Sequence, residues 1–248
     1  MINLADKINI LEVDITFCSY EDIIEYIKKQ IIKEEKTIIS YITFHSLNIL
    51  TKLKERNEIL NTVDLFHADG LGIYLASILL YGFRNNRRKI TGSDLYALLI
   101  NQAQIDNWSF YFFGDTESTL YRIKDDINVV GSQSGYDYNT DYLINKINSV
   151  APNFLVIGLG CPKQELWVLE NQGKIKANII ICVGNGLKIF AGVRKRGPFW
   201  MQKIGMEWLY RIYKEPKRLW KRYLVGIPVF IFKVIQFKFK LMLKNENT

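Results

Sequence analysis

The segment 153-NFLVIGLGCPKQELW-167 decides the fold of this chain. Its first part, Asn153 to Gly158, is an apolar run with the length of a buried β-strand, and Gly158 and Gly160 allow a tight turn after it. From Lys163 onward the spacing of apolar residues becomes helical, and Pro162 suits the first turn of a helix. A buried strand that enters a helix through a glycine turn is typical of a parallel α/β sheet.

The same alternation extends outward over most of the chain. The predicted strands are Ile8–Ile15, Thr37–Thr43, Val63–His67, Ser109–Phe113, Asn128–Gly131, Asn153–Gly158 and Asn178–Val183. The predicted helices are Glu21–Glu34, Ser46–Leu60, Leu71–Tyr81, Ser93–Asp106, Ser118–Asp126, Asp141–Val150 and Lys163–Lys174. This order predicts an α/β fold: a Rossmann-like, mostly parallel sheet with flanking helices, whose ligands bind where strands end.

Length and composition favour one main domain with an appendage. The chain has 248 residues, of which 48% are hydrophobic and 23% charged, values that are ordinary for a globular protein. Its three cysteines have neither metal-site nor disulfide spacing and lie in apolar surroundings, so we expect buried free thiols in a reducing compartment. The N-terminus lacks the apolar core of a signal peptide, and we therefore expect a cytoplasmic protein.

Positive charge gathers in the C-terminal quarter. Residues 194–248 hold 14 Lys and Arg against 3 Asp and Glu, a net charge of +11, whereas residues 1–193 hold 19 against 22. We place a domain boundary there: 1–193 is the predicted catalytic domain, and 194–248 a basic, aromatic, mostly helical appendage. Its apolar run Leu224 to Phe232 is too short to cross a bilayer, which needs about 20 residues. Peripheral attachment to the inner face of the cell membrane is the expectation.

A carboxylate follows one predicted strand. Asp69 comes directly after Val63 to His67 and stands beside two glycines, Gly70 and Gly72. At the end of a strand, Asp69 is a candidate general base. The alternative is that Asp69 only caps the helix that begins at Leu71.

Glycine turns also follow two other predicted strands. Gly158 and Gly160 lead into Lys163 and Gln164, and Gly184 follows Val183. Free backbone N–H groups at such a helix start favour a phosphate, and three convergent loops favour a nucleotide-sugar pocket. Alternatively, the glycines only permit tight turns and Lys163 is solvated. A dinucleotide fingerprint is not present, because a third glycine and a later acidic residue are missing.

A basic run precedes the helix that opens near Thr91. It contains Arg84, Arg87, Arg88 and Lys89, which are either a solvated surface or a source of positive charge for a diphosphate leaving group. With two histidines and no Asp-x-Asp pair in the chain, the sequence predicts chemistry without a metal or other cofactor.

Several segments in a fixed order resemble the WecG/TagA/CpsF glycosyltransferases. They are Thr43, Ala68-Asp69-Gly70-Leu71-Gly72, Thr91-Gly92-Ser93-Asp94-Leu95, Gly158 to Trp167, Ala191-Gly192, Arg196-Gly197-Pro198, Gly205 to Arg211, Glu215 to Arg218 and Arg222-Tyr223. The resemblance covers about residues 8 to 225, and its Pro-Lys-Gln-Glu and Glu-Trp-Leu-Tyr-Arg segments are specific.

The resemblance implies an inverting, metal-independent transfer of a sugar such as N-acetylmannosamine from a UDP-sugar. The implied acceptor is N-acetylglucosamine on a polyprenyl diphosphate, in teichoic acid, capsule or exopolysaccharide synthesis. In the family the aspartate is the proposed base, here Asp69. The family's sugar-pocket glutamine matches Gln164, its threonine near the acceptor matches Thr43, and its basic residue before Thr-Gly matches Lys89, with Arg88 as the neighbouring alternative. Appendage arginines thought to close over the site match Arg211, Arg218 and either Lys221 or Arg222.

Two positions depart from the family pattern. His45 stands where asparagine is common, and Lys188 stands where an aspartate commonly follows the Val-Gly turn. His45 is therefore either a substrate-binding residue or a structural histidine, and the sugar itself stays open.

Two other functions compete with sugar transfer. A basic tail with aromatic residues also suits a binder of single-stranded nucleic acid, although that function gives Asp69 and Gln164 no task, and we expect no nucleic-acid partner. The other alternative is a nonenzymatic scaffold of a polysaccharide assembly complex. A homo-oligomer is left open.

Overall fold

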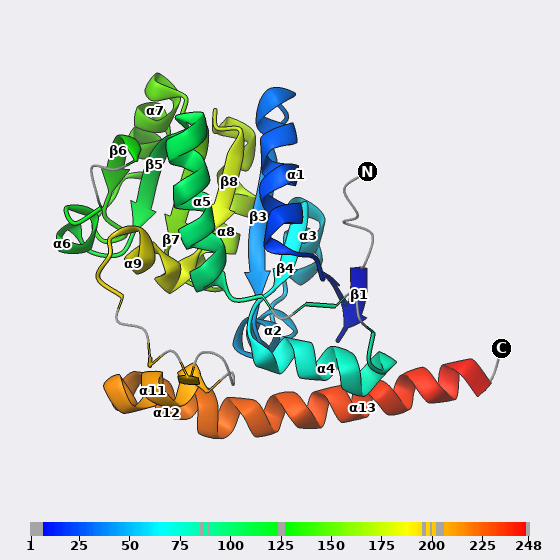
Figure 1. The fold of residues 1–248 in the computed structure, drawn as a ribbon. Helices are drawn as coiled ribbons and strands as arrows, with labels where there is room; N and C mark the ends of the chain where they lie inside the picture. The colour runs from blue at the N-terminus through cyan, green and yellow to red at the C-terminus, as the bar shows by residue number, and fades with distance from the viewer. Residues whose placement is uncertain are drawn as a thin grey trace.

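The computed structural model describes residues 7–84, 87–88, 90–123, 127–194, 197–198, 200–201 and 206–246. Within them, one eight-stranded sheet has the order β1-β2-β4-β3-β8-β7-β5-β6 (Figure 1). Only β1 and β2 pair in antiparallel fashion; the other neighbours are parallel. The strands are β1 (Lys7–Ile10), β2 (Val13–Thr16), β3 (Thr37–Ile42), β4 (Leu65–Ala68), β5 (Ser109–Gly114), β6 (Asn128–Gln133), β7 (Phe154–Gly158) and β8 (Ile179–Cys182). The predicted mostly parallel α/β fold is confirmed.

Helices cover both faces of this sheet (Figure 1). In the described residues they are α1 (Tyr20–Ile32), α2 (Phe44–Leu50), α3 (Arg56–Thr62), α4 (Leu71–Tyr81), α5 (Gly92–Asp106), α6 (Glu117–Leu120), α7 (Thr140–Val150), α8 (Lys163–Asn171), α9 (Leu187–Phe190), α11 (Glu207–Lys214), α12 (Pro216–Trp220) and α13 (Gly226–Glu246). Short 3-10 turns η1 (Gln172–Lys174) and η2 (Gly184–Gly186) and the π-helical turn η3 (Lys221–Val225) connect them.

The side chains on the two faces of the central strands belong to two separate hydrophobic cores. Along β8, Ile179 and Ile181 point to the core beneath α1 and α5, whereas Ile180 and Cys182 belong to the core on the other face. Alternation along a strand explains this division, and a strand buried on both faces must be apolar throughout. That is why the parallel strands appear in the sequence as continuous hydrophobic runs.

Two predicted elements are each divided in the structure. The strand expected over Ile8–Ile15 is a hairpin of β1 and β2, because Leu11 and Glu12 adopt positive φ angles of 55° and 63° and reverse the chain. The helix expected over Ser46–Leu60 is two helices, α2 and α3. Neither break contains a glycine or a proline, so the sequence gives little indication of a turn at either place.

The C-terminal helix α13 runs along one end of the molecule, next to α4 (Figure 1). It packs on the rest of the chain through Phe230 and Val234, which are buried in the same core as β3 and β4. Asn48 of α2 donates a hydrogen bond to the Gly226 carbonyl at 2.8 Å, and Lys233 donates to the Thr51 hydroxyl at 2.7 Å. Helix α13 continues without a break as far as Glu246.

None of the helices in the described ranges combines the length and the hydrophobicity needed to cross a bilayer. The proposed boundary at residue 194 stays a prediction, as does the role of residues 194–248 at a membrane.

Candidate active site

A cavity of about 620 Å³ lies where the central strands end. The loops after β3, β4 and β8 form its floor with Thr43, Asp69 and Asn185. Its other walls come from α4, α5, α11, η3 and α13. The carboxyl ends of parallel strands are where α/β sheets bind ligands, and the volume falls within the range of small-molecule sites.

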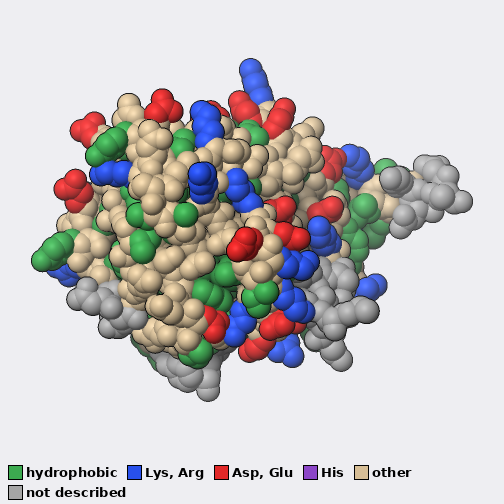
Figure 2. All heavy atoms as spheres, turned by 90° about the horizontal axis from the view of Figure 1, so that it is seen from above, with side chains coloured by type: hydrophobic (Ala, Val, Ile, Leu, Met, Phe, Trp, Pro, Cys, Tyr) green, Lys and Arg blue, Asp and Glu red, His purple; other side chains and the backbone are tan. Residues whose placement is uncertain are grey.

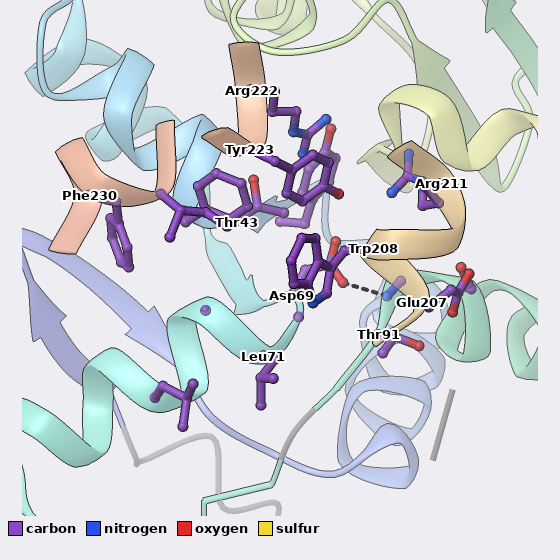
Figure 3. Close-up of a pocket in the computed structure, with 18 of the residues that line it drawn as sticks. Thr43, Asp69, Leu71, Thr91, Glu207, Trp208, Arg211, Arg222, Tyr223 and Phe230 are labelled. Atoms are coloured by element: carbon purple, nitrogen blue, oxygen red, sulfur yellow. Dashed lines mark hydrogen bonds between the residues drawn. The ribbon is translucent and has the colours of Figure 1, made fainter. Parts of the chain in front are cut away.

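Asp69 is fixed at the centre of this floor (Figure 3). Its backbone N–H donates to the Ile42 carbonyl of β3 at 2.8 Å, and Gly70 then turns the chain at a φ of 85°. The Gly92 N–H, in the first turn of α5, donates to Asp69 Oδ1 at 2.8 Å. Oδ2 accepts no hydrogen bond from the described residues, so one carboxylate oxygen is held and the other is available.

The helix-capping alternative for Asp69 is wrong. Gly70 occupies the N-cap of α4, and no side chain of the described residues caps that helix. The carboxylate serves the start of α5 instead, where the helix dipole also favours a negative charge.

Three arginines line the cavity. Arg194 precedes α11, Arg211 lies on α11 and Arg222 lies on η3. Burial lowers the pKa of Arg194 and of Arg222, their neighbour Arg211 lowers both further, and the charge of Asp69 opposes these shifts. The cavity therefore combines two carboxylates, Asp69 and Glu207, with three arginines.

Tyr96 brings a buried hydroxyl to the same cavity. It lies on α5 one turn after Gly92, and a Cβ on Gly186 would collide with its ring. The side chain is 2% exposed, and its hydroxyl has no hydrogen-bond partner in the described residues. Burial, with a smaller contribution from Asp69, raises the pKa of Tyr96 well above its usual range, so the hydroxyl stays protonated.

Thr43 lines the cavity as predicted, and it also begins a helix. Its Oγ1 accepts a hydrogen bond from the Ser46 N–H at 3.1 Å, and Ser46 Oγ accepts from the Thr43 N–H at 2.7 Å. This capping box fixes the threonine at the start of α2. His45, two residues on, is half-buried and does not line the cavity; burial and Arg222 lower its pKa to about 4, so the imidazole is neutral at pH 7.

Gln164 is fully buried beneath the cavity rather than among the residues that line it. Its Oε1 accepts from the Gly160 N–H at 3.2 Å and from the Gly184 N–H at 3.0 Å. Its Nε2 donates to Glu165 Oε1 at 2.8 Å, and Ser40 donates to the same oxygen at 3.0 Å. Burial raises the pKa of Glu165. Gln164 thus fastens two glycine turns together, and a direct contact with a sugar stays a prediction.

The three predicted glycines act through close packing and turning. A Cβ on Gly158 would lie 2.6 Å from Leu187 Cδ1, and a Cβ on Gly184 would collide with the Tyr41 hydroxyl. Gly160 turns the chain at a φ of 81°. None of them lines the cavity, but they allow the loops after β7 and β8 to pack against their neighbours.

Other predicted site residues lie away from the cavity. Lys163 and Arg88 are exposed, Lys221 contacts the ring of Trp220, and Arg218 forms an ion pair with Glu215. Lys89 lies outside the described residues. Its neighbour Arg87 is buried and donates to the Ser77 and Gly82 carbonyls, both at 2.9 Å, which gives part of the basic run a structural role.

A second cavity, of about 440 Å³, adjoins the first and shares Asn185, Arg194 and Arg211 with it. Its further basic residues are Arg122, Lys188 and Lys214. Lys188, one of the two departures from the family pattern, lies 3.9 Å from Asp115 in an ion pair. The shared arginines, Arg194 and Arg211, therefore border both cavities.

Metal ligands are not grouped at either cavity. Across the described ranges, no three His, Cys, Asp or Glu side chains lie together as a candidate metal site.

Sequence reasoning missed Arg194 and Tyr96 as site residues. Arg194 was counted in the appendage, and its place beside Asp69 depends on the path of the chain after α9. The position of Tyr96 could have been inferred from the sequence, because a residue four positions after Gly92 lies on the same face of the predicted helix.

A carboxylate at the end of a central parallel strand, with several arginines lining the same cavity, is an arrangement typical of α/β enzymes. Comparison with known proteins makes this specific. The chain belongs to the glycosyl transferase WecG/TagA/CpsF family, whose model matches residues 8–244. It is therefore a glycosyltransferase, and the predicted resemblance is confirmed.

Curated relatives match the chain along nearly its whole length. One is the N-acetylglucosaminyldiphosphoundecaprenol N-acetyl-beta-D-mannosaminyltransferase of Staphylococcus aureus strain MW2. It is 25% identical over 244 residues, which cover 95% of this chain and 94% of the relative. The protein of the same name from strain NCTC 8325 / PS 47 shows the same identity and coverage.

Proposed function

We propose that this enzyme transfers an N-acetylmannosamine-like sugar from a UDP-sugar to N-acetylglucosamine on a polyprenyl diphosphate, in the synthesis of a cell-surface polysaccharide or teichoic acid. The name of the relatives from Staphylococcus aureus supports both the sugar and the acceptor. The observation that carries the mechanism is Asp69, held by one oxygen at the centre of the cavity.

Asp69 acts as the general base. Its free oxygen takes the proton of the acceptor hydroxyl while that hydroxyl attacks the anomeric carbon of the donor. The bond to the UDP oxygen breaks as the new glycosidic bond forms, so a single displacement inverts the anomeric centre. From an α-linked donor this gives the β-linkage that the relatives' name specifies.

The arginines stabilise the departing diphosphate. Arg194 and Arg211 border both cavities, so a donor diphosphate at their junction would meet positive charge from either side. Fixed cations in a partly desolvated site can offset the developing negative charge without a metal ion. Metal-independent transfer is therefore part of the proposal. The Tyr96 hydroxyl is a hydrogen-bond donor for a substrate oxygen in the same cavity.

The surface formed by η3 and α13 supports attachment to a membrane. Hydrophobic side chains remain exposed along η3 and α13, among them Leu224, Val225, Phe232, Phe239, Met242 and Leu243. Viewed from the side opposite α13, acidic and basic side chains are instead intermixed (Figure 2). Exposed apolar residues beside lysines suit peripheral binding to an anionic bilayer. A lipid-linked acceptor would reach the cavity from that face.

Asp69→Asn tests the mechanism. The amide oxygen can still accept from the Gly92 N–H, so we expect the melting temperature to change little. Loss of a general base should lower kcat by roughly 10²- to 10⁴-fold, measured as sugar transfer from UDP-N-acetylmannosamine to a short-chain prenyl-diphosphate-linked N-acetylglucosamine.

The matched control is Asp106→Asn, at the far end of the same helix α5, where the carboxylate pairs with Lys28 at 3.3 Å. This variant should keep wild-type activity. An Asp69→Asn enzyme with more than a tenth of the wild-type kcat would contradict the assignment of the base.

A further inference from the structure

The first cavity continues into an apolar groove between α4 and α13. We call it the α4–α13 groove; its walls are Leu75, Ala76 and Leu79 of α4 and Ile227, Ile231 and Val234 of α13. The spacing of these residues places them along one side of each helix. The groove and Asp69 belong to the same cavity, so a molecule lying in the groove can extend to the base.

The groove has a covered floor and an open rim. Ala76 and Val234 are buried, with exposed fractions of 4% and 1%, whereas Leu75 and Ile231 are 51% and 48% exposed. Phe230 lies beneath, packed against Phe44 with ring centroids 6.2 Å apart. Half-exposed aliphatic side chains over a packed apolar floor leave hydrophobic area that a ligand can cover.

Charge is divided sharply along the cavity. Its charged lining residues are Asp69, Arg194, Glu207, Arg211 and Arg222, and none of them lies on α4 or α13. Figure 3 shows Arg211 and Phe230 on opposite sides of Asp69. One end of the cavity therefore suits an anion and the other an uncharged hydrocarbon.

We propose that the α4–α13 groove binds the first isoprene units of the acceptor's polyprenyl chain. This inference rests on the proposed function, whose acceptor carries a sugar, a diphosphate and a prenyl chain in one molecule. Such a molecule has an anionic head and an apolar tail. The head would match the arginines of the cavity, and the tail would match the apolar residues of α4 and α13. The enzyme would then bind part of the lipid itself, in addition to the sugar and diphosphate.

Two isoleucines on α13 provide a matched test. Ile231 is 48% exposed and lines the groove; Ile235 is 40% exposed on the same helix and does not line it. We would compare wild type, Ile231→Asn and Ile235→Asn on two acceptors with the same N-acetylglucosamine diphosphate, one on a 20-carbon isoprenoid and one on a methyl group. The reactions contain no membrane, so surface attachment cannot contribute.

For wild type we expect a higher kcat/KM with the isoprenoid acceptor than with the methyl acceptor. Ile231→Asn should lower the ratio of the two values roughly tenfold, since covering half an isoleucine accounts for a change of that order. Ile235→Asn should leave the ratio unchanged. Equal ratios in all three proteins, or equal losses in both variants, would overturn the inference.

Calorimetric binding of both acceptors separates this inference from the proposed function. If wild type transfers no sugar to either acceptor, the proposed function fails. The groove still stands if Ile231→Asn alone weakens binding of the isoprenoid acceptor relative to the methyl acceptor. If sugar is transferred equally well to both acceptors, the proposed function stands and the groove inference is refuted.

Discussion

Replacement of Gln164 by leucine should destabilise the enzyme because the glutamine joins two loops from inside. Leucine has a similar size but cannot accept the Gly160 and Gly184 N–H groups or donate to Glu165. The Gly184 bond is buried and the Gly160 bond is partly buried. A buried donor left without a partner costs about 1–3 kcal/mol, and one nearer to solvent costs less.

We therefore expect Gln164→Leu to lower the free energy of unfolding by about 3 kcal/mol, as measured by urea denaturation. For a chain of this size that corresponds to a fall in melting temperature of roughly 6–12 °C. The control is Gln172→Leu, just after the same helix α8, where the side chain makes no hydrogen bond to the described residues. It should change the stability by no more than about 0.5 kcal/mol.

Activity distinguishes this structural role from a contact with sugar. If Gln164 acts by holding the loops, loss of kcat should accompany loss of stability. A Gln164→Leu enzyme that is as stable as wild type but inactive would refute the reasoning and support the family-based prediction that this glutamine contacts the sugar.

Two further changes test other parts of the structure. Because the folded-state pKa of His45 is about 4 against a usual 6.5, the folded protein binds fewer protons than the unfolded chain, and stability should fall as pH drops from 7 to 5. An ideal calculation gives about 1.8 kcal/mol for that loss, which solvent screening at the half-buried ring reduces to about 1 kcal/mol. His45→Asn should remove this share of the acid sensitivity in urea titrations, and an unchanged pH slope would contradict it. Phe230→Ala should destabilise the whole chain by about 3 kcal/mol because it empties a buried site between α13 and α2, whereas a loss below about 1 kcal/mol would mean that α13 is only loosely attached.

Much of the fold could be predicted because parallel strands buried on both faces leave long apolar runs. The predicted bounds of helix α4 agree with the structure, and the ends of strands β3 to β8 differ from the prediction by at most two residues. The hairpin of β1 and β2 was missed because non-glycine residues, Leu11 and Glu12, make its turn. The packing of α13 was also missed, since long-range contacts rather than local periodicity decide which face of a helix is covered.

Site residues could be predicted from the sequence where a polar side chain directly follows a predicted strand. Asp69 and Thr43 line the cavity because each directly follows a central strand. Gln164 was recognised by resemblance, but its buried position depends on the approach of the loops after β7 and β8, which a sequence does not reveal. Arg222 and Arg218 looked equivalent in the basic segment, yet only Arg222 lines the cavity, because helical rotation turns Arg218 toward Glu215.

The order of the strands also bears on how the enzyme is made on the ribosome. Strand β3 can pair with β8 only after β8 has been synthesised. The paired residues Thr37 of β3 and Ile179 of β8 are far apart in the chain. Contacts between such distant residues slow folding. Asp69, the proposed base, is synthesised early because it lies in the first third of the chain, but its cavity gains its last wall only when α13 has emerged. For most of its synthesis, a nascent chain therefore carries this carboxylate without the complete cavity around it.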